Sequence, residues 1–195
     1  MLSLVIVVPL SLLALRYRRF EVLLTTFSRG IQVVPSIALF GLLMGPLAIL
    51  ANLTPHLRQW GISGIGPAPA MIGIAAYLLL PLASAVLTGI RVAPATLVEA
   101  AKGQGLSPVA ILCKLQLPLG LGVLAGGLRV AAVQAVGLAA LAALIGGGGY
   151  GTLIFQGIGQ LATDLILLGV LPVVALSLMV DGLLSSAQTA LEGSA

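Results

Sequence analysis

Long apolar stretches alternate with short polar ones along the chain. Four apolar stretches lie at residues 31–53, 68–90, 117–145 and 165–184. Each is long enough to cross a hydrocarbon layer of about 30 Å, because a helix of roughly 20 residues has that length. Helices also satisfy their own backbone hydrogen bonds, which the interior of a bilayer requires. The pattern therefore predicts an all-α, polytopic membrane protein.

A shorter apolar stretch, residues 2–15, comes first in the sequence. No basic segment precedes it, and Arg16, Arg18 and Arg19 follow it. A signal peptide has its basic segment first, so this order favours an uncleaved anchor whose N-terminus lies outside the cell. With this stretch we predict about five transmembrane helices and a single transmembrane domain over residues 1–195.

The composition agrees with this interpretation and excludes several functions. Only 7% of the 195 residues are charged and 59% are hydrophobic, whereas soluble domains carry about 25% charged residues. One Cys and one His provide neither a disulfide nor a plausible set of metal ligands. The basic residues are spread along the chain instead of forming a nucleic-acid-binding face. We therefore expect no enzyme activity, no catalytic residue, no metal, no cofactor and no nucleic acid partner.

The basic residues also predict the orientation of the spans. With five spans and an outer N-terminus, residues 16–29 and 91–117 lie in the cytoplasm. Arg58 and Trp60 then lie in an outer loop. Cytoplasmic loops of membrane proteins carry an excess of Lys and Arg, so the distribution supports this topology. The seven basic residues of the cytoplasmic segments are Arg16, Arg18, Arg19, Arg29, Arg91, Lys102 and Lys114.

The cytoplasmic segment at residues 91–117 has a pattern of its own. Thr96 and Glu99 have the spacing of a capping box, which predicts that a short helix begins there. Gly103 and Gly105 follow, and the conformational freedom of glycine favours the end of that helix. On these residues alone, Glu99 either caps a helix in an ordinary loop or belongs to a functional element.

A second helix is predicted directly after the glycines. Ser107 and Pro108 are typical of an N-cap and a first helical residue. We expect this helix to run as far as Pro118, which opens the next span. The segment thus predicts a helix, a glycine turn and a second helix at the inner face of the membrane.

The spacing within this segment resembles a known motif. A Glu-Ala-Ala triplet begins it, Gly105 follows after three residues, Leu115 after nine more, and a Leu-Pro pair one residue later. This is similar to the EAA loop of ATP-binding-cassette (ABC) importer permeases, in which isoleucine is usual at the position of Leu115. The resemblance implies a type I ABC importer permease fold with a cytoplasmic coupling helix that sits in a groove of an ATPase subunit. It assigns this coupling to Glu99, Ala100, Ala101 and Gly105, with Gly103 as a further contributor.

Other segments are similar to one branch of that family, the permeases for glycine betaine, choline and carnitine. The resemblance implies a subunit that moves such an osmoprotectant, a quaternary ammonium compound, by alternating access. Permeases for methionine or another amino acid share the architecture and remain an alternative. A stand-alone channel or ion-coupled carrier is a further alternative, which would need acidic groups or a selectivity motif within the spans. The segments that carry the resemblance are residues 16–19, 32–39, 89–91, 127–134 and 141–146.

The resemblance also implies partners. A dimer of a cytoplasmic ABC ATPase subunit would bind and hydrolyse ATP, and this chain would not. A second permease copy or a homologous permease would complete the pathway, and a separate substrate-binding protein would supply the substrate. The implied location is the bacterial cytoplasmic (inner) membrane, with several passes through the lipid bilayer.

Arg129 lies within the third of the long predicted spans. A charge at that depth is costly and usually faces protein or water. Arg129 therefore either lines the translocation pathway or fixes packing by pairing with Gln134, a carbonyl group or a neighbouring helix. Asp164 and Asp181 lie near the two ends of the last span, and we assign them no role.

Overall fold

The computed structural model describes residues 2–54, 56 and 63–192 of the chain. Arg58 and Trp60, which the sequence places in an outer loop, lie outside these residues. The described part contains helices and no strand, which confirms the all-α fold. The helices are α1 (Leu2–Arg16), α2 (Arg18–Val33), α3 (Ser36–Leu53), α5 (Pro67–Arg91), α6 (Ala95–Gly103), α7 (Pro108–Ile111), η1 (Leu112–Gln116), α8 (Leu117–Leu141), η2 (Ala142–Ile145), α9 (Tyr150–Gln160) and α10 (Thr163–Glu192).

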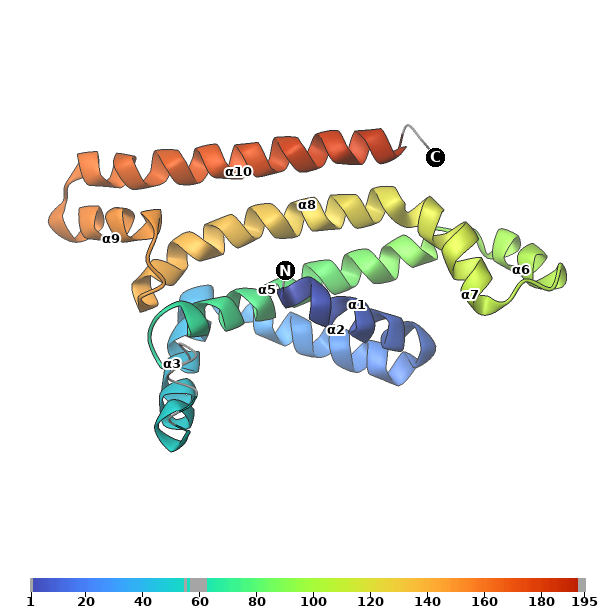
Figure 1. Cartoon of the computed structure of the whole chain (residues 1–195), viewed down its shortest axis with the longest axis horizontal. Coiled ribbons are helices and arrows are strands. Elements are labelled where there is room, and N and C mark those ends of the chain that lie inside the picture. The colour runs from blue at the N-terminus through green and yellow to red at the C-terminus, as the bar shows by residue number, and fades with distance from the viewer. Residues whose placement is uncertain (1, 55, 57–62, 193–195) are drawn as a thin grey trace.

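Three long helices form the centre of the molecule. Helices α5, α8 and α10 run side by side, with α8 in the middle (Figure 1). Glycine allows α5 and α8 to approach closely, because a Cβ atom at Gly120 would overlap the backbone of Gly89 and one at Gly127 would overlap Ala85. Small residues at such contacts let two membrane helices meet backbone to backbone.

Four long apolar spans are confirmed in length and composition, but the first of them begins at Ser36 and not at residue 31, because residues 31–33 belong to α2 and the helix is broken before Ser36. Four helical stretches are long and apolar enough to cross a membrane: Ser36–Leu53, Pro67–Arg91, Pro108–Ile145 and Thr163–Ala190. Helix α1 has 15 residues, and it starts beside the middle of α5 (Figure 1). A helix of that length extends roughly 23 Å, less than the hydrocarbon core of about 30 Å. The fifth span, and the treatment of the whole chain as one domain, stay predictions.

Helix α2 covers most of the segment that the sequence placed between the first two spans in the cytoplasm. It folds back against α1 and also packs on α5. Leu24 lies in one buried cluster with Val7 and Ala14 of α1 and Leu78 of α5. Polar and apolar residues of α2 alternate with the period of a helix, so no continuous apolar run marks it in the sequence.

The chain changes direction between α2 and α3. Pro35 has no N–H with which to continue the helix, and Val34 is extended. The hydroxyl of Tyr77 in α5 donates a hydrogen bond to the Val34 carbonyl, and the Gln32 side chain donates to the Tyr77 carbonyl at 3.3 Å. These two hydrogen bonds attach the segment between α2 and α3 to α5. Helix α3 then leaves in a different direction from α5, α8 and α10 (Figure 1).

A short helix that the apolar pattern did not predict, α9, lies between α8 and α10 in chain order. Gly146, Gly148 and Gly149 have positive φ angles, so the chain turns where only glycine adopts the required conformation readily. Helix α9 then packs on α10. Gly169 makes this contact close, because a Cβ atom there would lie 2.8 Å from the Tyr150 carbonyl oxygen.

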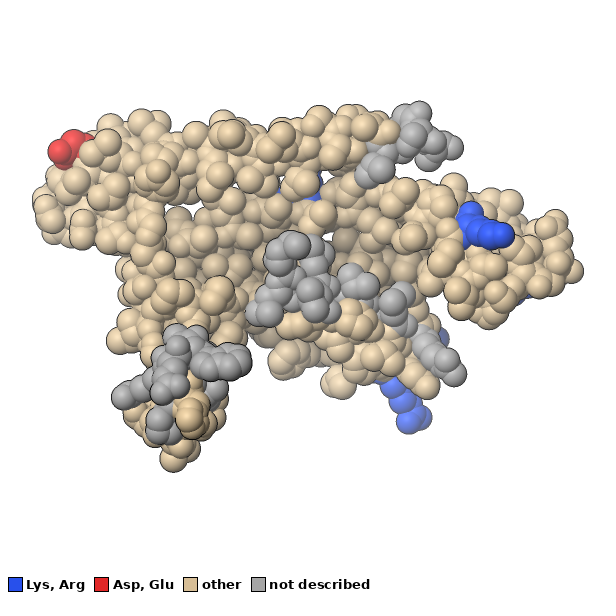
Figure 2. Space-filling model, viewed as in Figure 1, with Lys and Arg blue, Asp and Glu red and all other residues tan. Residues whose placement is uncertain are grey.

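Charged residues are distributed unequally along the molecule. Figure 2 shows Lys and Arg toward the end that carries α6 and the turn between α1 and α2, and an acidic group at the opposite end. An excess of basic residues is expected on the cytoplasmic side of a membrane protein. We therefore refer to the α6 end as the cytoplasmic end.

Candidate functional site: the α6 segment and two ion pairs

Helix α6 projects beyond the ends of α5 and α8 (Figure 1). None of its residues is buried. Glu99 and Ala100 are exposed, and Ala101 is half-buried. The Glu-Ala-Ala triplet thus lies on a helix that is accessible to another protein.

The predicted capping box is wrong. Helix α6 begins at Ala95 after Pro94, and no side chain caps it. The backbone N–H groups of Leu97 and Val98 donate to the Pro94 carbonyl, at 3.0 and 3.2 Å. Proline fixes its own φ angle at a value that leads into a helix, so the helix starts one residue before Thr96. Thr96 therefore lies inside the first turn and cannot act as its N-cap.

The glycine turn after α6 is confirmed, and Gly105 is the residue that makes it. Gly105 has a φ angle of 81°. Its N–H donates to the Lys102 carbonyl at 2.9 Å, and the N–H of Leu106 donates to the Ala101 carbonyl at 3.1 Å. This pair of bonds is a Schellman motif, which ends helices at a left-handed residue. Gly103 is the last residue of the helix and has no positive φ angle, so the turn does not depend on it.

The second helix of the segment begins as predicted but does not end as predicted. Ser107 is its N-cap, and its Oγ accepts a hydrogen bond from the N–H of Ala110 at 3.3 Å. The helix does not stop at Pro118, because the π-helical turn Leu112–Gln116 joins α7 to α8. Proline disrupts the regular α-helical hydrogen bonds before it, and in membrane helices a local π turn can satisfy the backbone groups that proline frees. One continuous helical rod therefore leads from the glycine turn into α8.

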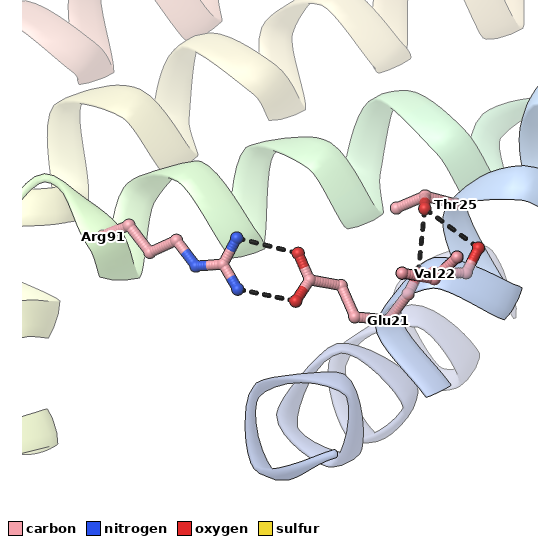
Figure 3. Close-up of polar contacts among 4 residues, drawn as sticks. All are labelled: Glu21, Val22, Thr25 and Arg91. Atoms are coloured by element: carbon pink, nitrogen blue, oxygen red, sulfur yellow. Dashed lines mark hydrogen bonds and ion pairs between the residues drawn. The ribbon is translucent and has the colours of Figure 1, made fainter. Parts of the chain in front are cut away.

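An ion pair joins the end of α5, which precedes α6 in the chain, to the first turn of α2. Arg91, the last residue of α5, donates from Nη1 and Nη2 to the two carboxylate oxygens of Glu21 in α2, at 2.8 and 2.7 Å (Figure 3). The hydrogen bonds from Arg91 lower the pKa of the Glu21 carboxyl, and the positive charges of Arg91 and Arg18 lower it further. The sequence alone does not reveal this pair, because the two residues lie 70 positions apart in the chain.

A second ion pair lies between α8 and α10. Arg129 donates from Nε to one carboxylate oxygen of Asp181 at 2.5 Å and from Nη2 to the other at 2.6 Å. Of the partners considered for Arg129, the structure shows a neighbouring helix, α10, through Asp181. The assignment of no role to Asp181 is wrong, since this carboxylate neutralises a charge within a candidate span.

Both charged side chains also line an open pocket of about 730 Å³ between the two helices. Arg129 and Asp181 remain 35% and 37% exposed despite their ion pair. Gln134, the other residue considered for pairing with Arg129, lines the same pocket. Arg129 therefore fixes a helix contact and faces an open space. The complete lining is Gly126, Arg129, Val130, Val133, Gln134, Asp181 and Gln188.

The sequence matches known transport proteins over most of its length. The family model described as binding-protein-dependent transport system inner membrane component matches residues 7–192. A carnitine transport permease protein of Listeria monocytogenes is 32% identical over 92% of this chain and 75% of its own length. A choline transport system permease protein of Bacillus subtilis is 32% identical over 96% of this chain and 79% of its own length. An osmoprotectant import permease protein of Salmonella typhimurium is also 32% identical, over 97% of this chain and 83% of its own length.

The fold is similar to that of a solved transporter. An inward-facing structure of the MetNI methionine ABC transporter superposes with a TM-score of 0.78, covering 97% of this chain and 87% of that one, at 19% sequence identity. The architecture is therefore that of a type I ABC importer permease. By its sequence and its helices, the chain belongs to the family of binding-protein-dependent transport system inner membrane components, and it is a multi-pass permease component of the bacterial inner membrane.

Proposed function

We propose that this chain forms the translocation pathway of an ATP-driven importer for osmoprotectants such as glycine betaine, carnitine and choline. The observation that carries the proposal is the similarity, over more than nine tenths of the chain, to permeases named for such substrates. The solved methionine transporter supports the architecture alone, because its sequence is only 19% identical. An amino-acid substrate is therefore the alternative and not the conclusion.

The proposed complex contains a second permease chain and two other kinds of subunit. Two permease chains, either two copies or one copy with a homologous permease, would enclose the pathway between them. A dimer of ABC ATPase subunits would bind ATP on the cytoplasmic side, so this chain itself would hold no cofactor. A separate substrate-binding protein would deliver the substrate at the outer side.

We assign the contact with the ATPase to α6. The small side chains of Ala100 and Ala101 would let the helix lie close against its partner, and Glu99 would contribute a charge to the contact. The support from the structure is the exposure of α6 at the cytoplasmic end. Gly105 would keep the direction of the helix fixed through its turn, and Gly103 would contribute only if the partner requires a small residue there.

Movement of α6 would reach the membrane through two stiff connections. On one side, the Ser107 cap and the continuous rod of α7, η1 and α8 follow the glycine turn. On the other side, α5 ends at Arg91, which is bonded to Glu21. When two ATPases close on ATP, they would therefore tilt α5 and α8 together instead of bending a loose loop.

The substrate class can be tested with the complete complex in proteoliposomes. The permease is produced together with its ATPase and binding protein, and ATP-driven uptake of labelled glycine betaine, carnitine, choline and methionine is measured. We expect uptake of at least one of the first three compounds and competition by the others. Uptake of methionine alone would replace the osmoprotectant with an amino acid. Absence of ATP-dependent uptake of all four would contradict the proposal.

A further inference from the structure

We propose that Arg129 and Asp181 form a recognition site for a zwitterionic substrate within the pathway. The Arg129 guanidinium would bind the carboxylate of the substrate, and the Asp181 carboxylate would hold its ammonium group. The inference rests on the proposed function, since it names the residues through which the pathway would distinguish among osmoprotectants.

The geometry of the ion pair would allow a substrate carboxylate to replace the Asp181 carboxylate at Arg129. Arg129 presents Nε and Nη2 to the two oxygens of Asp181 at 2.5 and 2.6 Å. This planar, two-point arrangement is the one in which a guanidinium binds any carboxylate, including that of a ligand. A substrate carboxylate could therefore take the place of the Asp181 carboxylate with the same two hydrogen bonds.

The surroundings of the pair indicate a wet or protein-covered face and not a lipid-facing one. Arg129 and Asp181 keep about a third of their surface exposed, and this surface opens on the pocket of about 730 Å³. Charged groups in a membrane normally face a bundle interior or a water-filled cavity. A pocket of this volume also lies within the range of small-molecule sites, about 300–1,000 Å³.

Charge balance determines which substrates the site favours. Separating the pair without a replacement would leave two unpaired charges in a membrane, which is strongly unfavourable. A zwitterion such as glycine betaine or carnitine supplies both opposite charges, so each side chain exchanges one partner for another. Choline carries only the cation and would leave Arg129 unpaired. The site should therefore favour zwitterions over choline.

Asp181 is the group in this pocket that can recognise a quaternary ammonium. Such a cation has no N–H to donate, so proteins recognise it by negative charge or by the faces of aromatic rings. Among the residues that the structure describes as lining the pocket, none is aromatic and Asp181 is the only acid. Recognition of the cation here would therefore be electrostatic.

Transport by the complete reconstituted complex tests the inference through two substrates. KM and the maximal rate are measured for glycine betaine and choline in the wild type, Arg129→Gln, Asp181→Asn and Asp164→Asn. Asp164→Asn is the matched control, because Asp164 is an exposed acid in the first turn of the same helix, α10. We expect Arg129→Gln to raise the KM of glycine betaine about tenfold or more but to leave the KM of choline unchanged or lower it, because choline then leaves no Arg129 charge unpaired. Asp181→Asn should raise both KM values, and the control neither.

A role of the pair in packing alone would give another result. Equal effects of Arg129→Gln on the two substrates, or no effect of either Arg129→Gln or Asp181→Asn, would overturn the inference while the wild type still transports. Co-purification of the ATPase shows whether each variant assembles. If Arg129→Gln fails to assemble, Arg129→Lys keeps the charge but loses the two-point contact, and it must raise the KM of glycine betaine selectively. A wild type that transports none of glycine betaine, carnitine and choline would overturn the proposed function, and this inference with it.

Discussion

Arg91 at the end of α5 and Glu21 in the first turn of α2 form a two-point ion pair, with distances of 2.8 and 2.7 Å. Arg91 lies four residues before Ala95, the first residue of α6. The pair therefore fixes the cytoplasmic end of α5 to a second helix directly beside the proposed contact with the ATPase. In the proposed function it is a brace through which movement of α6 reaches α2 as well as α5.

Glu21→Gln should weaken transport more than it weakens the fold. The pair is partly exposed, and such pairs contribute at most about 1 kcal/mol to stability. We expect a small decrease in the melting temperature but a clear decrease in substrate transported per ATP hydrolysed, because the brace is lost. Arg29→Gln, which removes an exposed charge from the same helix, is the control. If Glu21→Gln transports as much substrate per ATP hydrolysed as the wild type does, the ion pair does not have this role in coupling.

The same pair predicts a pH dependence of stability. The pKa of Glu21 is lowered in the folded protein, so the folded state binds the proton of this carboxyl less readily than the unfolded state does. The contribution of the pair is therefore present above the ordinary carboxyl pKa and is lost as the pH falls through the lowered value. The difference in melting temperature between wild type and Glu21→Gln should shrink in acid. A difference of the same size at neutral and strongly acidic pH would contradict this assignment.

Gly105 and Gly103 provide a matched pair for testing the turn after α6. A Cβ atom at either position would meet no atom within 4 Å, but only Gly105 has a positive φ angle. Alanine in that conformation costs about 1–2 kcal/mol, so Gly105→Ala should displace the turn and reduce substrate-stimulated ATPase activity. Gly103→Ala should preserve the turn. Equal loss of activity in both variants would indicate that the partner, and not the turn, requires glycine.

Substitutions of Glu99 and Thr96 distinguish docking of the ATPase from capping of α6. Neither residue caps α6, and both are exposed. We expect Glu99→Ala to reduce co-purification of the ATPase while Thr96→Ala leaves it unchanged. A real capping box would instead make both changes destabilise the helix, each by about 1 kcal/mol. Similar losses of ATPase co-purification in the two variants would therefore indicate a capping box after all, and docking through Glu99 would lose its support.

Because α5 and α8 are in close contact, two glycine-to-alanine substitutions in α8 should change the free energy of unfolding in opposite directions. Replacing glycine with alanine in a helix normally stabilises it by up to about 1 kcal/mol. Gly137→Ala should do so or be neutral, because a Cβ atom there meets no atom within 4 Å. Gly127→Ala would force the added atom into Ala85, and such overpacking costs about 1–3 kcal/mol. Thermal unfolding in detergent measures both, and a stabilised Gly127→Ala would contradict the close contact.

The sequence predicted the features that depend on composition and on local chain geometry. The four long spans follow from continuous apolar runs, and the turn at Gly105 and the cap at Ser107 follow from the properties of those residues. The capping box failed because Pro94, two residues before Thr96, already directs the chain into the helix. A proline close to a capping motif can therefore decide where the helix begins, because it fixes the φ angle of the backbone there.

The features that escaped prediction depend on contacts between distant parts of the chain. Arg129 alone indicated a partner, but a single sequence does not identify Asp181, 52 positions away, as that partner. Helix α2 escaped because its buried side, with Leu24 and Ser28, is interrupted by polar residues on the other side. Both features become visible only when the packing of α8 on α10 and of α2 on α1 is known.

Transport by the chain with and without its ATPase tests the central claim most directly. Accumulation of labelled glycine betaine against a gradient is measured in proteoliposomes that contain the permease and the binding protein, with the ATPase subunit either present or omitted. The account predicts accumulation only when both the ATPase and ATP are present. Accumulation by the permease without the ATPase would contradict it and would indicate a self-sufficient carrier.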